Sequence, residues 1–350
     1  MMKLAIVKQK YIPGYTWKSH TWDNPKSMLN DFMLRSKNFS LLFETKGDVW
    51  VVDDSHYESD TYRTMKQKRP MELKELCDSQ ESVPWGDVPW QDYDVVITLD
   101  PIAPKSLIEM YENVLWCYYC AEHSSKVWNK SLKKPVQKYD LFLDHVLQTE
   151  IKPVNKLPLA VRFPAVVSRM AFRETLDLRK KYDRVFLDSH AIRKITDFET
   201  FDTDMFKQFG IEADYPKPWK FSESYAAVAQ KQMLSTKDYL QRVAYSKYFY
   251  LCRRASGNGF VGQAAPEAAG LGCVVIADES CVYAKHLCHP MTLIENGDDY
   301  DTASLVIQSI QDNNDLYKEV IAYQNERLNR IFNREPIELL ERYSRIKKGA

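Results

Sequence analysis

The sequence contains no apolar run of the roughly 20 residues that a membrane-spanning helix requires. Its first apolar segment, residues 4–7, is too short for the core of a signal peptide and runs directly into Lys8 and Lys10. An excess of charge of one sign is also absent, because 48 basic residues balance 48 acidic ones. We therefore expect no membrane span, no secretory leader and no general attraction to nucleic acid or to an anionic membrane.

Regular cysteine spacing is missing as well. The seven cysteines are scattered and odd in number, which is typical of reduced thiols in a cytoplasmic protein. Cys117 and Cys120 have the spacing of half a zinc site, but they fall within a predicted strand, where residues three apart point to opposite faces. A second group of cysteine and histidine residues, at 281–289, lacks the spacing of the other half. We therefore expect no structural zinc.

Two common catalytic signatures do not occur. The sequence has no Gly-X-Ser-X-Gly elbow of the kind that presents the nucleophile of a serine hydrolase. No Gly-Lys-Ser/Thr follows the glycine-rich stretch at 257–262, so this stretch is not the phosphate loop of a nucleoside triphosphatase. These absences direct attention away from hydrolysis by a nucleophilic side chain.

Apolar strand-like segments alternate with helical ones along most of the chain, which predicts α/β architecture with helices on both faces of a parallel sheet. With 350 residues we expect two domains, since single cores rarely grow that large. We place a first domain at 1–162, a second at 163–335 and a final helix at 336–350. The predicted strands are residues 4–7, 39–43, 49–52, 93–99, 114–121, 139–143, 159–161, 184–188, 246–252 and 273–277. The spacing of apolar residues predicts helices at 25–37, 302–310 and 316–332, and Pro336 starts the final helix.

A glycine-rich loop in the second half is the most informative feature of the sequence. Gly257, Gly259 and Gly262 make a loop whose backbone can take positive φ and approach a ligand closely. A short helix follows, in which Pro266 suits the first turn. Gly270 and Gly272 end this helix, and residues 273–277 then form an apolar strand. Such a loop presents free N–H groups and the positive end of a helix dipole, which favour phosphate.

This loop and helix resemble the donor-binding motif of GT-B glycosyltransferases. The matching segments are Gly259-Phe260-Val261-Gly262 and Glu267-Ala268-Ala269-Gly270, followed by an apolar strand. The resemblance implies two Rossmann-like, doubly wound domains that face a cleft. The first would bind the acceptor and the second the nucleotide-sugar donor, and the final helix would pack back toward the first domain.

Two details of the sequence refine the expected reaction. Many retaining members of the family carry a second Glu eight positions before Glu267, where this sequence has Gly259, so we expect inversion. An Asp-X-Asp motif carries the metal in the other large glycosyltransferase fold. Asp202-Thr203-Asp204 has these letters, but it lies in a helix-like region and not at the end of a first-domain strand. We therefore expect a mechanism that needs no metal and no cofactor besides the nucleotide sugar.

The resemblance also implies which residues bind the donor. Cations near the diphosphate would stabilise the leaving nucleoside diphosphate as its charge develops, and the Glu267 carboxylate would hold a ribose or sugar hydroxyl. The candidate donor-binding residues are Ser189, His190, Arg193, Arg253, Arg254, Gly259, Phe260, Val261, Gly262 and Glu267. The alternative is that residues 189–194 are an ordinary basic surface turn.

Inverting transfer also needs a base that removes the proton of the acceptor hydroxyl. The main candidates at the carboxyl ends of first-domain strands are Glu122 and Asp100. We prefer Glu122, because it follows the most apolar strand of the domain, where partial desolvation strengthens a carboxylate base. Either carboxylate could instead cap a neighbouring helix.

The sequence thus predicts a cytoplasmic glycosyltransferase, a hexosyl- or pentosyltransferase, that uses a nucleoside-diphosphate sugar. Its acceptor would be a glycan or another hydroxyl-bearing molecule, and DNA is an alternative acceptor. One alternative is a phage-type DNA-base glycosyltransferase, in which Lys66, Lys68 and Arg69 would line a basic groove. Another is a non-catalytic module of the same fold that binds a nucleotide or a carbohydrate.

Overall fold

The computed structural model describes residues 2–9, 47–52, 83–99, 103–120, 138–144, 159–163, 176–179, 181–187, 210–214, 236–251, 264–279, 284–295 and 299–349. These residues belong to two compact units. Those up to Phe163, together with those from Arg334 onward, form the first unit, and those from Leu176 to Asn333 form the second.

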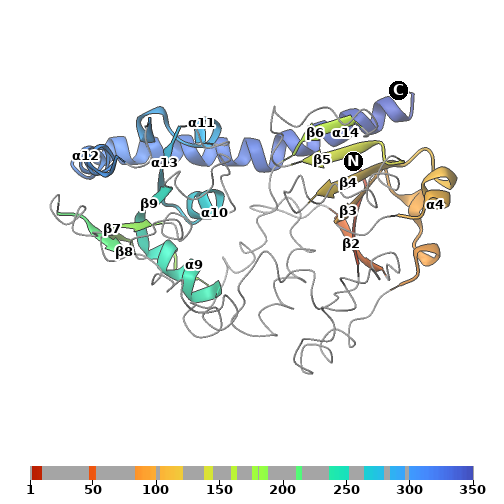
Figure 1. The fold of residues 1–350 in the computed structure, drawn as a ribbon, viewed down its shortest axis with the longest axis horizontal. Helices are drawn as coiled ribbons and strands as arrows, with labels where there is room; N and C mark the ends of the chain where they lie inside the picture. Colours follow the sequence, from red (N-terminus) through yellow and green to blue (C-terminus); the bar gives the residue numbers. More distant parts are fainter. Residues whose placement is uncertain are drawn as a thin grey trace, which may run out of the picture. The chain divides into compact units, whose positions relative to one another are not determined.

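Six parallel strands form the sheet of the first unit, in the order β2-β1-β3-β4-β5-β6 (Figure 1). Residues 4–7, 95–98 and 115–119 of the inner strands are all buried, which explains why their sequences are apolar almost without interruption. The strands are β1 (Leu4–Gln9), β2 (Gly47–Val52), β3 (Val95–Leu99), β4 (Leu115–Cys120), β5 (Leu141–Asp144) and β6 (Leu159–Arg162).

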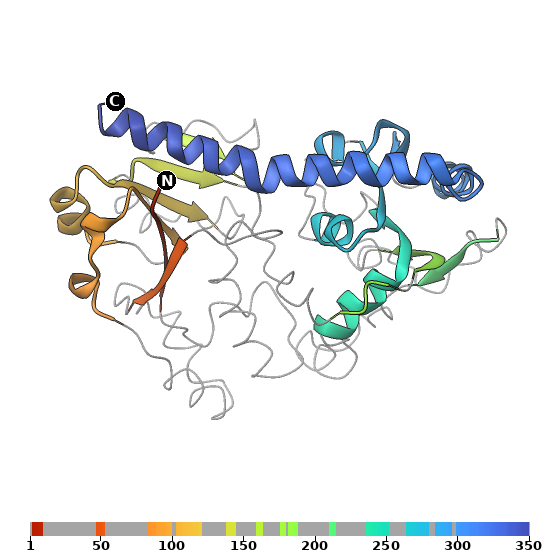
Figure 2. The same ribbon diagram turned by 180° about the vertical axis from the view of Figure 1, so that it is seen from behind.

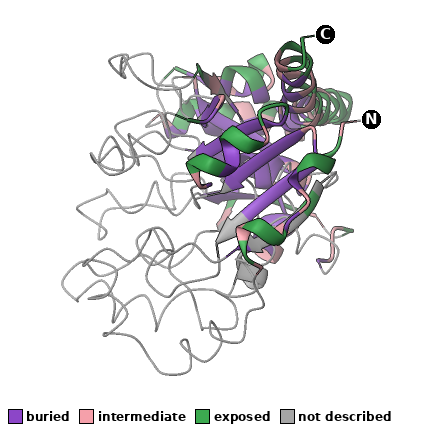
Figure 3. Ribbon diagram, turned by 90° about the vertical axis from the view of Figure 1, so that its right-hand side faces the viewer, coloured by how far each residue is buried: buried purple, intermediate pink, exposed green. Residues whose placement is uncertain are grey.

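One face of this sheet packs against helix α4 (Lys105–Met110) and two short turns, η3 (Trp85–Asp87) and η4 (Trp90–Asp92). The Trp90 ring is fully buried, and its centroid lies 5.6 Å from that of Trp85 and 5.5 Å from that of Trp116. Its Nε1 donates to the Trp85 carbonyl oxygen at 2.7 Å, so the buried indole N–H is satisfied. Figure 3 shows these buried strands beside helices with exposed outer faces.

Helix α14 (Glu335–Lys347) is fastened to the amino edge of the same sheet by ion pairs. Lys347 Nζ lies 2.5 Å from Asp140 Oδ2, just before β5, and Lys348 pairs with Asp94, just before β3. Burial alone would raise the pKa of Asp94, but hydrogen bonds from Lys348 and from the Lys3 backbone N–H outweigh it, so this pKa is lowered. The C-terminal helix is thus tied to the chain segments that enter two inner strands.

Five parallel strands form the sheet of the second unit, in the order β11-β10-β9-β7-β8. The Phe186 and Phe249 rings on neighbouring strands stack with centroids 6.0 Å apart and are fully buried. The strands are β7 (Tyr182–Leu187), β8 (Glu212–Asp214), β9 (Ser246–Leu251), β10 (Val274–Asp278) and β11 (Leu293–Ile294).

Helices α12 (Tyr300–Gln311) and α13 (Asn314–Asn329) cover part of this second sheet. Each begins with a side-chain cap: Asp299 accepts from the Thr302 N–H at 2.9 Å, and Asn313 accepts from the Leu316 N–H at 3.1 Å. Helix α13 also lies against α10 (Ala264–Gly270) and α11 (Ala284–Leu287), as Figure 2 shows. The short turn η7 (Pro290–Thr292) precedes β11.

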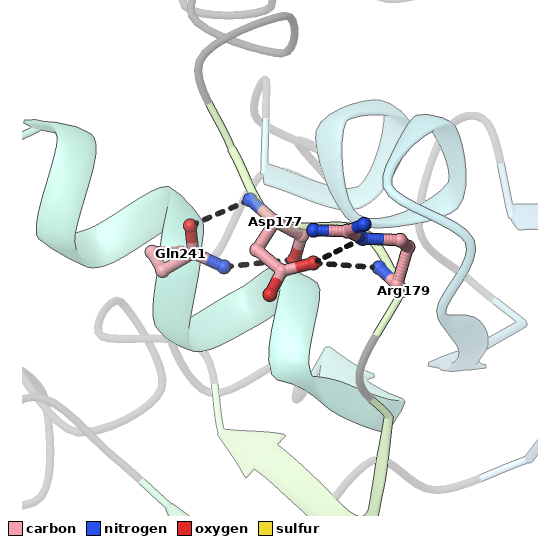
Figure 4. A network of polar contacts seen from close by, with 3 residues as sticks. All are labelled: Asp177, Arg179 and Gln241. Carbon is pink, nitrogen blue, oxygen red and sulfur yellow. Dashed lines mark hydrogen bonds and ion pairs between the residues drawn. The ribbon is translucent and has the colours of Figure 1, made fainter.

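The segment that leads into β7 is held to helix α9 (Thr236–Tyr245) by one side chain (Figure 4). Gln241 Oε1 accepts from the Asp177 backbone N–H at 2.9 Å, and Gln241 Nε2 donates to the Asp177 carbonyl oxygen at 3.0 Å. The Arg179 backbone N–H in turn donates to Asp177 Oδ1 at 3.0 Å. The glutamine amide therefore pairs with the backbone as a neighbouring strand would.

A second glutamine amide, that of Gln324, pairs with the backbone at the start of β10. Strand β11 pairs only with Ala277 and Asp278, at the end of β10. Nearer its start, Gln324 of α13 takes the place of a strand: its Oε1 accepts from the Val275 N–H at 2.8 Å and its Nε2 donates to the Cys273 carbonyl oxygen at 2.9 Å. Gln324 is 1% exposed, so it satisfies two backbone groups away from water.

Helices α13 and α14 are joined by a π-helical segment, η8 (Arg330–Arg334). We predicted one helix at 316–332 and a second that starts at Pro336, and Pro336 does lie in the first turn of α14. Because proline has no N–H to donate to the carbonyl four residues earlier and its ring crowds that carbonyl, a regular α-helical ladder is interrupted at Phe332. The wider π turn accommodates this interruption.

The predicted fold class, α/β with two doubly wound parallel sheets, is confirmed. The sequence interpretation missed β8 and β11, which contain only three and two residues and so carry no readable alternation. The helix predicted at 25–37 and the strand predicted at 39–43 lie outside the described residues.

Replacement of Gln324 by leucine should destabilise the second unit strongly. The substitution leaves a buried N–H and a buried carbonyl without partners, each at a cost of about 1–3 kcal/mol, so we expect the free energy of unfolding, measured in urea, to fall by ~2–6 kcal/mol. Asn325→Leu, at the exposed neighbouring position, is the control and should change stability by less than about 0.5 kcal/mol. Equal stability of the two variants would show that the Gln324 amide is dispensable.

Candidate functional site

The strand order of the second sheet reverses between β7 and β9. From β7 the chain goes outward to β8, and it then returns to the other side of β7 to form β9, β10 and β11. Leu187 lies opposite Tyr250 in parallel register, so β7 and β9 end at the same edge of the sheet. In open parallel sheets, ligands bind outside the carboxyl ends of the strands where the order reverses. This edge is the candidate donor site.

Both predicted cationic loops leave the sheet at this reversal. Ser189, His190 and Arg193 follow β7 in the chain, and Arg253 and Arg254 follow β9. These five residues and residues 259–262 lie outside the described part of the chain. The paired strands nevertheless bring the starting points of the two loops to neighbouring positions.

Helix α10 connects β9 to β10 and is fixed at its carboxyl end. Gly272 has φ of 80°, and the N–H groups of Gly272 and Cys273 donate to the Ala269 and Ala268 carbonyl oxygens, both at 2.9 Å. This is a Schellman cap, which requires the left-handed conformation that glycine adopts most easily. The predicted end of this helix near Gly270 and Gly272 is confirmed.

The side chain of Lys181 shows which edge of the sheet this cap occupies. Lys181 Nζ donates to the Leu271 carbonyl oxygen at 2.8 Å and to the Ser246 carbonyl oxygen at 3.3 Å. Lys181 directly precedes β7 and Ser246 begins β9, so the end of α10 lies at the amino edge. The first turn of α10 therefore points toward the opposite edge, where β7 and β9 end.

Glu267 is the one predicted donor-binding residue that the structure describes. It lies in the first turn of α10 and is 1% exposed. A carboxylate buried to this degree requires polar partners. The two alanines that follow it are also buried, because α10 packs closely on the sheet and on α13. Glu267 thus belongs to the helix that approaches the candidate donor site.

The first sheet has a reversal of its own, between β1 and β3. Strand β1 pairs with β2 on one side and with β3 on the other, and its Lys8 lies opposite Leu99 at the end of β3. Asp100 follows β3 directly in the chain. Glu122 follows β4, one strand further from the reversal. Both carboxylates lie outside the described residues, as does the basic cluster of the DNA alternative.

No three histidine, cysteine, aspartate or glutamate side chains gather into a metal-binding group within the described ranges. Cys117 is fully buried in β4, where burial, followed by the charge of Asp140, raises the pKa of its thiol well above the usual value. Burial likewise raises the pKa of Cys273, which donates to the Val243 and Ser246 carbonyl oxygens. Both thiols therefore stay protonated and pack in the core.

Sequence reasoning missed three residues that hold the elements of the second unit in place. Lys181, Gln241 and Gln324 hold helices and strand ends in place through their bonds to backbone groups. No local motif marks them, because the backbone partners named above lie 49 to 90 positions away in the chain. Their only sequence signal is a long polar side chain in or beside an otherwise apolar segment.

No helix in the described segments is both long and apolar enough to cross a membrane. No family model matches the sequence, and no curated protein matches it by sequence comparison.

Solved structures do resemble this chain over its whole length. An alpha-glucosyltransferase in complex with UDP and a 13-mer DNA containing a HMU base is 13% identical, with 100% of each chain covered and a TM-score of 0.50. T4 phage BGT in complex with UDP and Mn²⁺ is 11% identical, again with 100% of each chain covered, at a TM-score of 0.45.

A sucrose-phosphate synthase from Thermosynechococcus elongatus is 12% identical over 100% of each chain, at a TM-score of 0.45. The fold assignment rests on the likeness to the alpha-glucosyltransferase, together with the two parallel sheets. The chain has the GT-B fold of nucleotide-sugar-dependent glycosyltransferases.

Proposed function

We propose that the protein transfers a sugar from a nucleoside-diphosphate sugar to an acceptor hydroxyl, with inversion and without a required metal. The observation that carries this proposal is the reversal of strand order between β7 and β9, since both predicted cationic loops follow these two strands. The similar alpha-glucosyltransferase was solved with UDP, which supports a uridine nucleotide as the first donor to test.

The proposed chemistry divides between the two units. In the second, Arg193, Arg253 and Arg254 would neutralise the diphosphate as the bond from its oxygen to the anomeric carbon breaks. In the first, a carboxylate would take the proton of the acceptor hydroxyl as that oxygen attacks the opposite face of the same carbon. The products are the glycosylated acceptor and the nucleoside diphosphate.

Strand order favours Asp100 over Glu122 as this base. Asp100 follows β3, which flanks the reversal of the first sheet, whereas Glu122 follows the next strand outward. Ligands of doubly wound sheets bind at such a reversal. We therefore propose Asp100 as the base and revise our preference for Glu122, which rested on the apolar character of β4.

A hydroxyl on a DNA base is a second candidate for the acceptor. The similar alpha-glucosyltransferase was solved with a 13-mer DNA containing a HMU base, and that likeness covers the whole chain. Lys66, Lys68 and Arg69 supply positive charge in the first half of the sequence. Such a patch would neutralise DNA phosphates, and binding would weaken steeply as salt is raised.

The proposal is tested by an assay for release of nucleoside diphosphate from a panel of donors and acceptors. The panel includes UDP-glucose, a short duplex carrying a hydroxymethylated base, its unmodified counterpart and simple glycans. We expect acceptor-dependent release of diphosphate, with the product anomer, measured by NMR, opposite to that of the donor. Addition of EDTA should leave the rate within about twofold, because protein cations and backbone N–H groups neutralise the diphosphate.

Three results would contradict parts of this proposal. Absence of turnover together with tight nucleotide binding would favour the non-catalytic module. Loss of turnover with EDTA and its recovery with manganese would reject the metal-independent mechanism. Retention of the donor anomer would reject inversion.

Replacement of the proposed base should lower turnover strongly without changing the affinity for the donor nucleotide. For Asp100→Asn we expect kcat to fall by about 10²- to 10⁴-fold, the usual contribution of general base catalysis, with UDP affinity unchanged in calorimetry. Glu122→Gln is the matched variant and should keep kcat within about tenfold. A larger loss for Glu122→Gln than for Asp100→Asn would restore Glu122 as the base.

Glu267→Gln should weaken donor binding by about ten- to a hundredfold. A hydrogen bond from a sugar or ribose hydroxyl to a carboxylate contributes about 1.5–3 kcal/mol, and the amide accepts more weakly. Because Glu267 is 1% exposed, the apo protein should also lose some thermal stability. Glu212→Gln, an exposed change on β8, is the control for both measurements. A stability loss with unchanged UDP affinity would make Glu267 a purely structural residue.

A further inference from the structure

The hydroxyl of Tyr139 joins two points of the chain on either side of Asp100. It accepts a hydrogen bond from Thr98 Oγ1 at 3.0 Å and another from the Ala103 backbone N–H at 2.7 Å. Thr98 is the fourth residue of β3, two positions before Asp100, and Ala103 lies three positions after it. Tyr139 and Ala103 are each 3% exposed and Thr98 is 0% exposed, so all three groups are shielded from water.

The Tyr139 ring is itself held firmly. Tyr139 lies two residues before β5, and its ring meets the Tyr118 ring of β4 edge-on, with centroids 5.5 Å apart. The next residue, Asp140, exchanges two hydrogen bonds with Trp116: its N–H donates to the Trp116 carbonyl oxygen at 2.9 Å, and its Oδ2 accepts from the Trp116 N–H at 2.8 Å. Lys347 also pairs with Asp140. The hydroxyl therefore has a fixed place on the sheet.

The Ala103 N–H depends on this hydroxyl. Ala103 precedes Pro104, the N-terminal cap of α4, whose carbonyl oxygen accepts from the N–H groups of Leu107 and Ile108. A buried N–H that loses its acceptor is costly, so the chain strongly prefers the arrangement in which Ala103 meets Tyr139. Thr98 is fixed within β3 by its strand neighbours. One oxygen thus ties the end of β3 to the start of α4.

We propose that Tyr139 is a positioning residue for the transfer reaction. By holding Thr98 and Ala103 on one oxygen, it fixes the two ends between which Asp100 stands in the sequence. The inference rests on the proposed function, since it requires Asp100 to act on the acceptor. Tyr139 itself does not take part in proton transfer. Its contribution is geometric, and a displacement of about 1 Å at a reacting group can lower a rate about a hundredfold.

The test compares Tyr139→Phe with Tyr93→Phe. Both substitutions remove one hydroxyl from the same hydrophobic core and keep the ring. The Tyr93 hydroxyl donates to Asp48 Oδ2 at 2.8 Å and accepts from Trp50 Nε1 at 2.9 Å. Tyr93 lies just before β3, away from the carboxyl end of that strand. Tyr93→Phe therefore controls for the general loss of a buried phenol.

We expect Tyr139→Phe to lower kcat about ten- to a hundredfold and to leave the UDP dissociation constant within twofold. Hydrogen–deuterium exchange at the Ala103 amide should become faster by a similar factor. Tyr93→Phe should lower the melting temperature but keep kcat and the Ala103 exchange rate within twofold of wild type. Thr98→Val, which removes only the hydrogen bond from Thr98 and keeps that from Ala103, should reduce kcat less than Tyr139→Phe.

Two failures can be told apart. If wild-type protein turns over and Tyr139→Phe keeps a kcat equal to that of Tyr93→Phe, the positioning role is wrong, whatever happens to stability. Unchanged exchange at Ala103 in Tyr139→Phe would overturn it as well. If the wild-type protein releases no diphosphate with any donor and acceptor, the proposed function fails first, and the positioning role falls with it.

Discussion

Parallel pairing of strands is the constraint on which the rest of this structure depends. In each unit every described strand runs in the same direction, so every strand ends at one edge of its sheet and begins at the other. Side chains that follow different strands are thereby gathered at one edge, although they are far apart in sequence. The reversals of strand order, between β1 and β3 and between β7 and β9, then select one place along each edge where a ligand can approach.

The described contacts that stabilise the backbone lie at the amino edges, whereas the chemistry that we propose lies with loops at the carboxyl edges. At the amino edges, long polar side chains fasten the backbone: Lys181 holds the end of α10, Gln241 holds the segment before β7, and Lys347 ties α14 to Asp140. These contacts leave the carboxyl edges to the loops that carry the proposed chemistry. Loops on a rigid scaffold are where binding and catalytic residues usually occur.

Tyr139 connects the two edges of the first sheet. It enters from the amino side, just before β5, and its hydroxyl reaches Thr98 near the end of β3 and Ala103 at the start of α4. Through this residue, the packing of the core fixes Thr98 and Ala103, the described residues on either side of Asp100 in the sequence. A phenol suits this task, because its apolar ring can be buried among Tyr118 and Phe142 while its oxygen accepts hydrogen bonds at the tip.

The sequence by itself determined the elements that are long and regular. The apolar runs of β3, β4 and β10 and the periodicity of α12 and α13 could be recognised because each is a local pattern of five or more residues. The glycine loop and Glu267 were likewise found from adjacent residues, and Pro336 marked the start of the last helix. The fold class followed from the alternation of these elements.

Only the tertiary structure decided the strand order, the short edge strands and the polar contacts that bridge distant segments. Strand order depends on which backbones pair, and our proposal of Asp100 in place of Glu122 rests on that order alone. Strands β8 and β11 are too short to show a period, and they exist because a longer neighbour offers them a partner. Gln324, Lys181 and Tyr139 act on residues 36 to 90 positions away, so no local window of sequence contains both partners.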